Sequence, residues 1–196
     1  LFRQIGQFAQ MGFGGFHLHA RTGLQTPYLG KAFMAEIRAC TAEAKRRDML
    51  AWLYDEDRWP SGFGGGWVTQ DPKHRLKYLL FTPTPYNGTV RPTPNWSCAL
   101  AGRLENGTLL ARYAVRLDSG NCLEYRRLRD NESGSRGEQV WYAYLETVDG
   151  VPWYNHQGFV DTLSREAIDR FTEVTHERYR EAVGEHFGRT IPAIFT

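Results

Sequence analysis

The feature that most constrains the fold is an unbroken apolar run from Met49 to Tyr54 (MLAWLY), which stops abruptly at the polar segment Asp55–Trp59 (DEDRW). A run without polar interruption is typical of a strand that is buried on both faces of a parallel sheet. The preceding segment, Lys31–Arg47, repeats apolar residues at helical spacing and ends in basic residues, which suit a helix C-terminus. A helix followed by a buried strand is the repeating unit of α/β proteins.

The same alternation is found towards both ends of the chain. A helical stripe in residues 1–10 precedes a short strand that ends at His19, and the periodic segment 164–187, with Ser164 as its N-cap, precedes an apolar run at Ile191–Phe195. This order predicts an α/β fold with about the first four strands of a (β/α)8 TIM-type barrel.

Residues 76–150 follow a different pattern and predict an antiparallel β insertion. Runs of β-branched and aromatic residues succeed one another without helices, and Asn106-Gly107 is a strong hairpin-turn signal. The expected strands are Tyr78–Tyr86, Trp96–Arg103, Thr108–Leu117 and Val140–Val148, and the polar segment Asp130–Gly137 is interpreted as a mobile loop. The expected domains are residues 1–75 as the first βα units, 76–150 as the insertion, and 151–196 as the resumed barrel.

The length is too short for this architecture. The chain has 196 residues, and a whole barrel takes about 200–250 without any insertion. The chain opens on Leu1 and stops within an apolar run at Thr196. We therefore expect a part of a longer protein, whose open barrel edges favour self-association.

Composition limits the classes of partner. The 24 basic and 22 acidic residues nearly cancel, and neither sign forms a long block, so neither nucleic acid nor a membrane surface is an expected partner. The chain lacks an apolar run of transmembrane length. The two glycine clusters, near Gly14 and Gly64, lack the context of a dinucleotide or phosphate loop, so we expect no cofactor. Three widely spaced cysteines favour neither a disulfide scaffold nor a zinc knuckle, and the cellular compartment stays open.

Polar residues at the strand ends are the candidate site, because ligands of parallel α/β sheets bind at the C-terminal ends of the strands. His17, His19 and Arg21 end the first strand, and the segment 55–59 ends the second. Carboxylates beside an arginine and a tryptophan suit a sugar, and paired carboxylates can hydrolyse a glycosidic bond. The catalytic candidates are Asp55 and Glu56, and the substrate-binding candidates are His17, His19, Arg21, Arg58, Trp59 and His156.

Each candidate has an alternative. Asp55 or Glu56 can pair with Arg58 and shape a loop without catalytic work. Alternate residues of a strand share a face, so His17 and His19 could bind a metal ion in an amidohydrolase-like hydrolase, with His156 as a third ligand. We assign no metal, and interpret His74, His176 and His186 as loop or helix-surface residues.

A third hypothesis is a non-catalytic carbohydrate-binding module. The insertion contains four aromatic residues that could form a sugar platform or alternate into its core, and the core is the preferred interpretation: Trp96, Trp141, Tyr142 and Tyr144.

The stretches GFGGFHLHARTGLQTPYLG, AWLYDEDRWPSGFGGG and FVDTLSREAIDRFTEVTHERYREAVGEHFGRTIPAIFT resemble large bacterial glycoside hydrolases. The resemblance is to α-L-rhamnosidase-like proteins of glycoside hydrolase family 106 and their relatives. It covers residues 1–75 and 150–196, and DEDRWPSG is its most specific element.

The resemblance implies a (β/α)8 barrel that acts on a poly- or oligosaccharide at rhamnose or a related sugar. It also implies a glycone pocket lined by His17, His19, Arg21, Asp55, Glu56, Arg58 and Trp59. In the relatives the main catalytic acid follows the position of Thr196. We therefore expect this part of the protein to supply sugar-binding residues and to be inactive alone.

Overall fold

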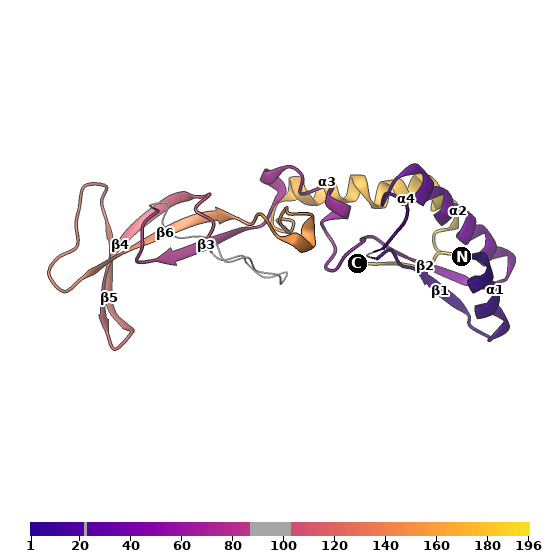
Figure 1. Ribbon diagram of the computed structural model, residues 1–196, viewed down its shortest axis with the longest axis horizontal. Helices are drawn as coiled ribbons and strands as arrows, with labels where there is room; N and C mark the ends of the chain where they lie inside the picture. Colours follow the sequence, from indigo (N-terminus) through magenta and orange to yellow (C-terminus); the bar gives the residue numbers. More distant parts are fainter. Residues whose placement is uncertain (22, 87–102) are drawn as a thin grey trace. The chain divides into compact units, whose positions relative to one another are not determined.

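The computed structural model describes residues 1–21, 23–86 and 103–196, which form two compact units (Figure 1). Unit 1 comprises Leu1–His74 and Val160–Thr196, and unit 2 comprises Arg75–Phe159. The sequence assigned residues 151–159 to the resumed α/β part. They lie in unit 2, where a backbone hydrogen bond from the Val151 N–H to the Gln157 carbonyl closes a turn around the 3-10 helix Pro152–Tyr154.

Unit 1 contains a parallel sheet of β1 (Gly15–Leu18), β2 (Leu50–Tyr54) and β7 (Ile194–Phe195), in the order β1-β2-β7. Three parallel strands are therefore found in the described chain where about four were expected, and the sheet is open. Residues 158–163 do not contribute a strand to it. The mixed α/β class is confirmed.

The helices of unit 1 are α1 (Phe2–Gln10), α2 (Lys31–Arg46), α3 (Arg165–Val174) and α4 (His176–Val183), with 3-10 turns at Gly64–Gly66, Pro72–His74 and Gly184–His186. Ser164 caps α3 as predicted, because its hydroxyl accepts a hydrogen bond from the Ala167 N–H at 3.3 Å. The prediction of one helix over 164–187 is wrong. The helix breaks at Thr175, whose ψ is −74° and whose hydroxyl donates to the Phe171 carbonyl.

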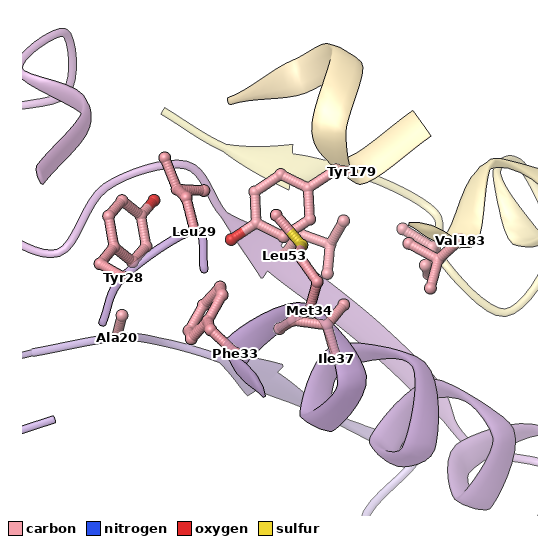
Figure 2. Close-up of a cluster of buried hydrophobic side chains, with 10 residues drawn as sticks. Ala20, Tyr28, Leu29, Phe33, Met34, Ile37, Leu53, Tyr179 and Val183 are labelled. Carbon is pink, nitrogen blue, oxygen red and sulfur yellow. The ribbon is translucent and has the colours of Figure 1, made fainter. Parts of the chain in front are cut away.

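Helices α2 and α4 cover one face of the parallel sheet (Figure 2). Leu18 and Leu53 lie side by side in the register of β1 and β2, and they pack against side chains from both helices. The main helical contributors are Phe33, Met34, Ile37, Tyr179 and Val183. Because β1 and β2 are parallel and pack against these helices, their C-terminal ends lie at the same edge of the sheet. Among the described helices, none combines the length and apolar character needed to cross a lipid bilayer.

Unit 2 is an antiparallel sheet in the order β3-β6-β4-β5, formed by β3 (Lys77–Thr82), β4 (Thr108–Asp118), β5 (Asn121–Leu128) and β6 (Gln139–Thr147). The strand expected at Trp96–Arg103 falls almost entirely outside the described residues. Asn106-Gly107 leads into β4, whose neighbours are β5 and β6. The hairpin that follows β4 turns instead at Ser119-Gly120, with φ of 50° and 85°.

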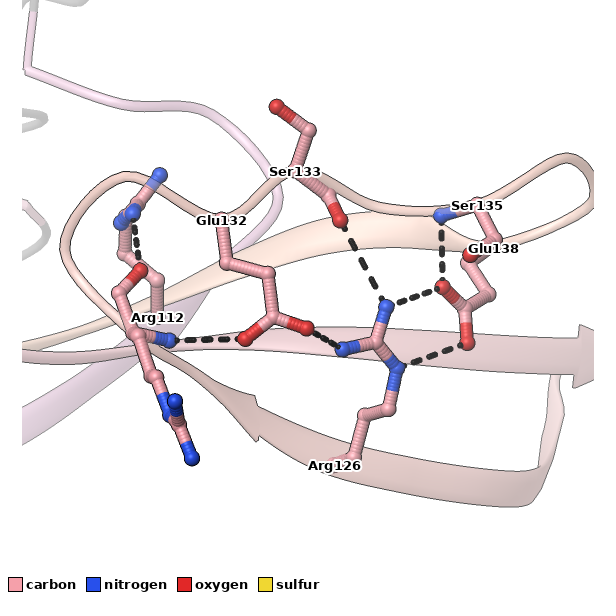
Figure 3. Close-up of polar contacts among 7 residues, drawn as sticks. Arg112, Arg126, Glu132, Ser133, Ser135 and Glu138 are labelled. Carbon is pink, nitrogen blue, oxygen red and sulfur yellow. Dashed lines mark hydrogen bonds and ion pairs between the residues drawn. The ribbon is translucent and has the colours of Figure 1, made fainter.

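The segment Asp130–Gly137 is held against β5, which differs from its interpretation as a mobile loop (Figure 3). The Arg126 guanidinium donates to the carboxylates of Glu132 and Glu138. Those carboxylates in turn accept backbone N–H groups of Arg129 at 3.1 Å and Ser135 at 2.7 Å. Arg126 of β5 thus forms ion pairs with carboxylates near both ends of the segment.

Candidate functional site

The parallel pairing of β1 and β2 brings the two polar clusters of unit 1 together. His17 lies opposite Trp52, and their rings stack at 5.6 Å. Two residues further along, the His19 ring lies 4.2 Å from the ring of Tyr54. Both histidines are exposed and contact alternate residues of β2. They therefore lie on the sheet face opposite the one that α2 and α4 cover.

Asp55, the first residue after β2, is 0% exposed and its carboxylate is held by two side chains. Oδ1 accepts a hydrogen bond from the Ser61 hydroxyl at 2.7 Å, and Oδ2 lies 2.7 Å from Nε2 of His176. His176 is the first residue of α4, directly after the helix break, so the break places its ring against Asp55. His176 is therefore a helix residue with a side chain 38% exposed, as expected, but its pairing with Asp55 was not predicted.

Glu56 is also 0% exposed, and backbone groups bind its carboxylate. Oε1 accepts the N–H groups of Asp57 at 3.0 Å and Gly65 at 2.8 Å, and Oε2 accepts that of Gly64 at 2.6 Å. Gly64 and Gly65 have φ of 61° and 62°, and a Cβ on Gly65 would lie 2.6 Å from Cδ1 of Tyr28. Glu56 therefore shapes the glycine turn that follows it.

The burial of Glu56 opposes its ionisation. Burial raises the pKa of Glu56 to about 8, although its three N–H donors favour the charged form and so lower the pKa. The neighbouring Asp57 carboxylate raises the pKa further. Both predicted catalytic carboxylates are thus enclosed by the protein's own groups, as in the loop-shaping alternative, but their partners differ from the Arg58 expected there.

Trp59 is the exposed residue of this loop, whereas Asp57 and Arg58 are partly buried and Asp57 Oδ1 is fully buried. Trp59 is 58% exposed, and Arg58 Nε lies 3.7 Å from Oδ2 of Asp57. Asp57 Oδ1 has no hydrogen-bond partner in the part of the chain that the structure describes. The Tyr54 hydroxyl donates to the Arg58 carbonyl at 3.2 Å, which ties this loop to the end of β2.

A cavity of about 450 Å³ lies beside His19. Its lining is mostly apolar and includes Leu18, Ala20, Phe33 and Ile37. Partial burial, followed by the nearby charges of Arg21 and His17, lowers the pKa of His19. The His19 imidazole is therefore neutral at pH 7 and able both to donate and to accept a hydrogen bond.

The remaining histidines are not gathered at this edge. His156 belongs to unit 2, where it is exposed in a turn with φ of 58°. His74 is buried, with Nδ1 3.0 Å from the Val68 carbonyl, which differs from its expected place on the surface. Within the described ranges, three or more His, Cys, Asp or Glu side chains do not come together as a metal site, so His17 and His19 lack a third ligand there.

The aromatic residues expected to act together in unit 2 lie on different faces of its sheet. Tyr144 is buried and stacks on Tyr86 at 3.7 Å, and Tyr142 lies near Tyr144 on the same face. Trp141 points to the opposite face, where it stacks on Phe81. Trp96 lies outside the described residues.

Compared with known proteins, the chain matches no family model, and neither the curated proteins nor the solved structures give a match.

Proposed function

We propose that the chain is part of the (β/α)8 barrel of a glycoside hydrolase, and that the C-terminal ends of β1 and β2 bind a sugar residue of a poly- or oligosaccharide. The observation that carries the proposal is the contact of His19 with Tyr54. This contact brings together the two polar clusters at residues 17–21 and 55–59, which are separated in the sequence. Both clusters lie at the C-terminal ends of parallel strands, where barrels bind ligands.

The accessible groups fit a sugar. Trp59 offers an exposed ring to the apolar face of a pyranose, in the way that aromatic side chains commonly cover flat apolar surfaces. Arg58, whose side chain is partly exposed next to Trp59, supplies N–H donors that suit sugar hydroxyls. His19 is neutral, and Arg21 is exposed beside it.

In this proposal Asp55 and Glu56 are positioning residues. Asp55 orients Ser61 and His176, and Glu56 holds the glycine turn, so neither presents a carboxylate to the sugar. The general acid is then another carboxylate. This agrees with the family resemblance, which places the main acid after the position of Thr196.

The test is calorimetric titration of the full chain with L-rhamnose, with D-glucose as the neutral hexose for comparison. We expect saturable binding of rhamnose that is weakened at least about tenfold, about 1.4 kcal/mol, by Trp59→Ala. Trp67→Ala is the matched control, because Trp67 is also exposed in unit 1 and its ring lies against Arg178 of α4. Equal loss in the two variants, or unchanged affinity in Trp59→Ala, would contradict the proposal.

A further inference from the structure

One face of the unit 2 sheet carries an aromatic ring on every strand. Phe81 of β3, Trp141 of β6, Tyr113 of β4 and Tyr125 of β5 follow the strand order of the sheet. Phe81 stacks on Trp141 at 4.9 Å, Trp141 is the cross-strand partner of Tyr113, and Tyr113 contacts Tyr125 at 6.4 Å. We call these four side chains the aromatic row.

The aromatic row is open to solvent, although the floor beneath it is packed. Phe81 is 47% and Tyr125 is 73% exposed, and all four rings line a cavity of about 500 Å³. Between them Val115 and Ala143 are buried. A contiguous exposed aromatic surface of this kind marks a binding site more often than scattered apolar residues do.

The opposite face of the sheet holds the polar core of unit 2. Glu146 is 0% exposed, and it accepts hydrogen bonds from the hydroxyls of Tyr78 and Tyr86 and from the N–H groups of Leu104 and Glu105. The buried carboxylate of Glu146 therefore finds its hydrogen-bond partners on this face, without the aromatic row.

The charges that flank the aromatic row have one sign. The strand register places Arg127 of β5 on the face of the row as the cross-strand partner of Tyr113, whereas Lys77 lies on the same face four residues before Phe81, about 13 Å along β3. The acidic residues described on the four strands occupy other positions: Glu124 pairs with Arg116 on the opposite face, Glu146 is in the polar core, and Asp118 ends β4. The face is thus complementary to an anionic ligand.

A nucleic acid would also supply anionic groups and flat rings. Binding of a nucleic acid strand depends on a basic track for many phosphates, whereas the basic and acidic residues of unit 2 nearly balance. An acidic oligosaccharide fits better, because its pyranose rings present apolar C–H faces to the aromatic side chains and a uronic acid carboxylate can pair with Arg127. The saccharide rings stack on the aromatic row, and a carboxylate reaches Arg127 beside Tyr113.

We propose that the aromatic row is a binding platform for an oligosaccharide that contains uronic acid residues. This platform belongs to unit 2 alone and does not depend on the sugar site proposed at the strand ends of unit 1. Either proposal can fail without the other.

The experiment is calorimetric titration of the full chain with penta-galacturonate, with cellopentaose as the uncharged probe and penta-uridylate as the nucleic acid probe. We expect saturable binding of penta-galacturonate, about tenfold or more weaker in Tyr125→Ala and in Arg127→Gln, and weaker at higher salt. Tyr125 is largely exposed, so its truncation leaves the sheet intact. Phe2→Ala removes an exposed ring from unit 1 and serves as the matched control, which should bind as the wild type does.

Four outcomes would overturn the proposal. Equal affinity for penta-galacturonate and cellopentaose would show that charge does not contribute to binding. Tighter binding of penta-uridylate would indicate that the ligand is a nucleic acid and not a saccharide. Self-association that is lost in Tyr125→Ala, measured by sedimentation, would assign the row to a second copy of the chain. Unchanged binding of penta-galacturonate in both variants would place its site elsewhere.

Discussion

The buried Glu56 carboxyl predicts an unusual dependence of the stability of unit 1 on pH. The ordinary pKa of a glutamate is 4.5, and burial raises the pKa of Glu56 to about 8 in the folded chain. The folded state holds this proton more tightly than the unfolded state. Glu56 therefore contributes stability that is fully present below pH 4.5 and is lost as the pH rises through 8. The linkage amounts to about 1.36 kcal/mol per pH unit, or roughly 5 kcal/mol over the whole window.

Glu56→Gln isolates this effect, because glutamine keeps the shape and cannot ionise. At pH 5 the substitution should destabilise unit 1 by about 1–3 kcal/mol, since its amide nitrogen faces the Gly64 N–H and leaves that donor unsatisfied. At pH 9 the wild type has lost roughly 5 kcal/mol and the variant has not. Glu56→Gln should therefore be the more stable protein by about 2–4 kcal/mol.

Native-state hydrogen exchange measures this difference within unit 1. The N–H groups of Ala51 and Leu53 in β2 donate to the carbonyls of Thr190 and Ala193, so their protection, corrected for intrinsic rates, follows the opening of the parallel sheet. Comparing variant with wild type at each pH cancels the other titrating groups. Parallel stability curves for the two proteins between pH 5 and 9 would refute the reasoning.

Three further predictions concern unit 1. His176→Ala removes one of the two side chains that hold the buried Asp55 carboxylate, and should lower the free energy of unfolding by about 1–3 kcal/mol in urea at pH 7; a loss within experimental error would exclude a structural role for the pair. Gly65→Ala should cost about 2 kcal/mol or more in the same assay, because φ is +62° and the new Cβ meets Tyr28. Gly188→Ala, at φ +71° in open space, should cost about 1 kcal/mol, so equal losses would contradict the steric argument. Ser164→Ala removes the N-cap of α3 and should lower stability by about 1 kcal/mol, whereas Ser164→Asp should restore it, as thermal unfolding would show.

The periodic elements of the fold could be predicted from the sequence. The α2 stripe of Phe33, Ile37, Cys40 and Ala44 is buried as its spacing requires. β5 was not predicted, because Asn121–Leu128 is exposed along most of its length and lacks an apolar alternation. The break at Thr175 was not predicted either, because the apolar stripe continues from Phe171 to Tyr179 across it.

The candidate site was only partly accessible to sequence reasoning. The rule that ligands bind at strand ends selected His19 and Trp59, because each follows a strand within a few residues of the sequence. The environment of Asp55 depends on His176, which is 121 residues away in the sequence. That of Glu56 depends on the left-handed φ values of Gly64 and Gly65. A sequence pattern contains no direct signal for either contact, although four glycines in DEDRWPSGFGGG indicate that the backbone turns closely there.

The central claim, that the C-terminal ends of β1 and β2 bind a sugar, is tested most directly by mapping NMR shifts during a titration of the full chain with L-rhamnose. We expect saturable shifts of the Trp59 indole N–H and the His19 ring, with the Trp67 indole N–H unchanged. Shifts that do not saturate, or that leave Trp59 and His19 unmoved while another surface responds, would contradict it.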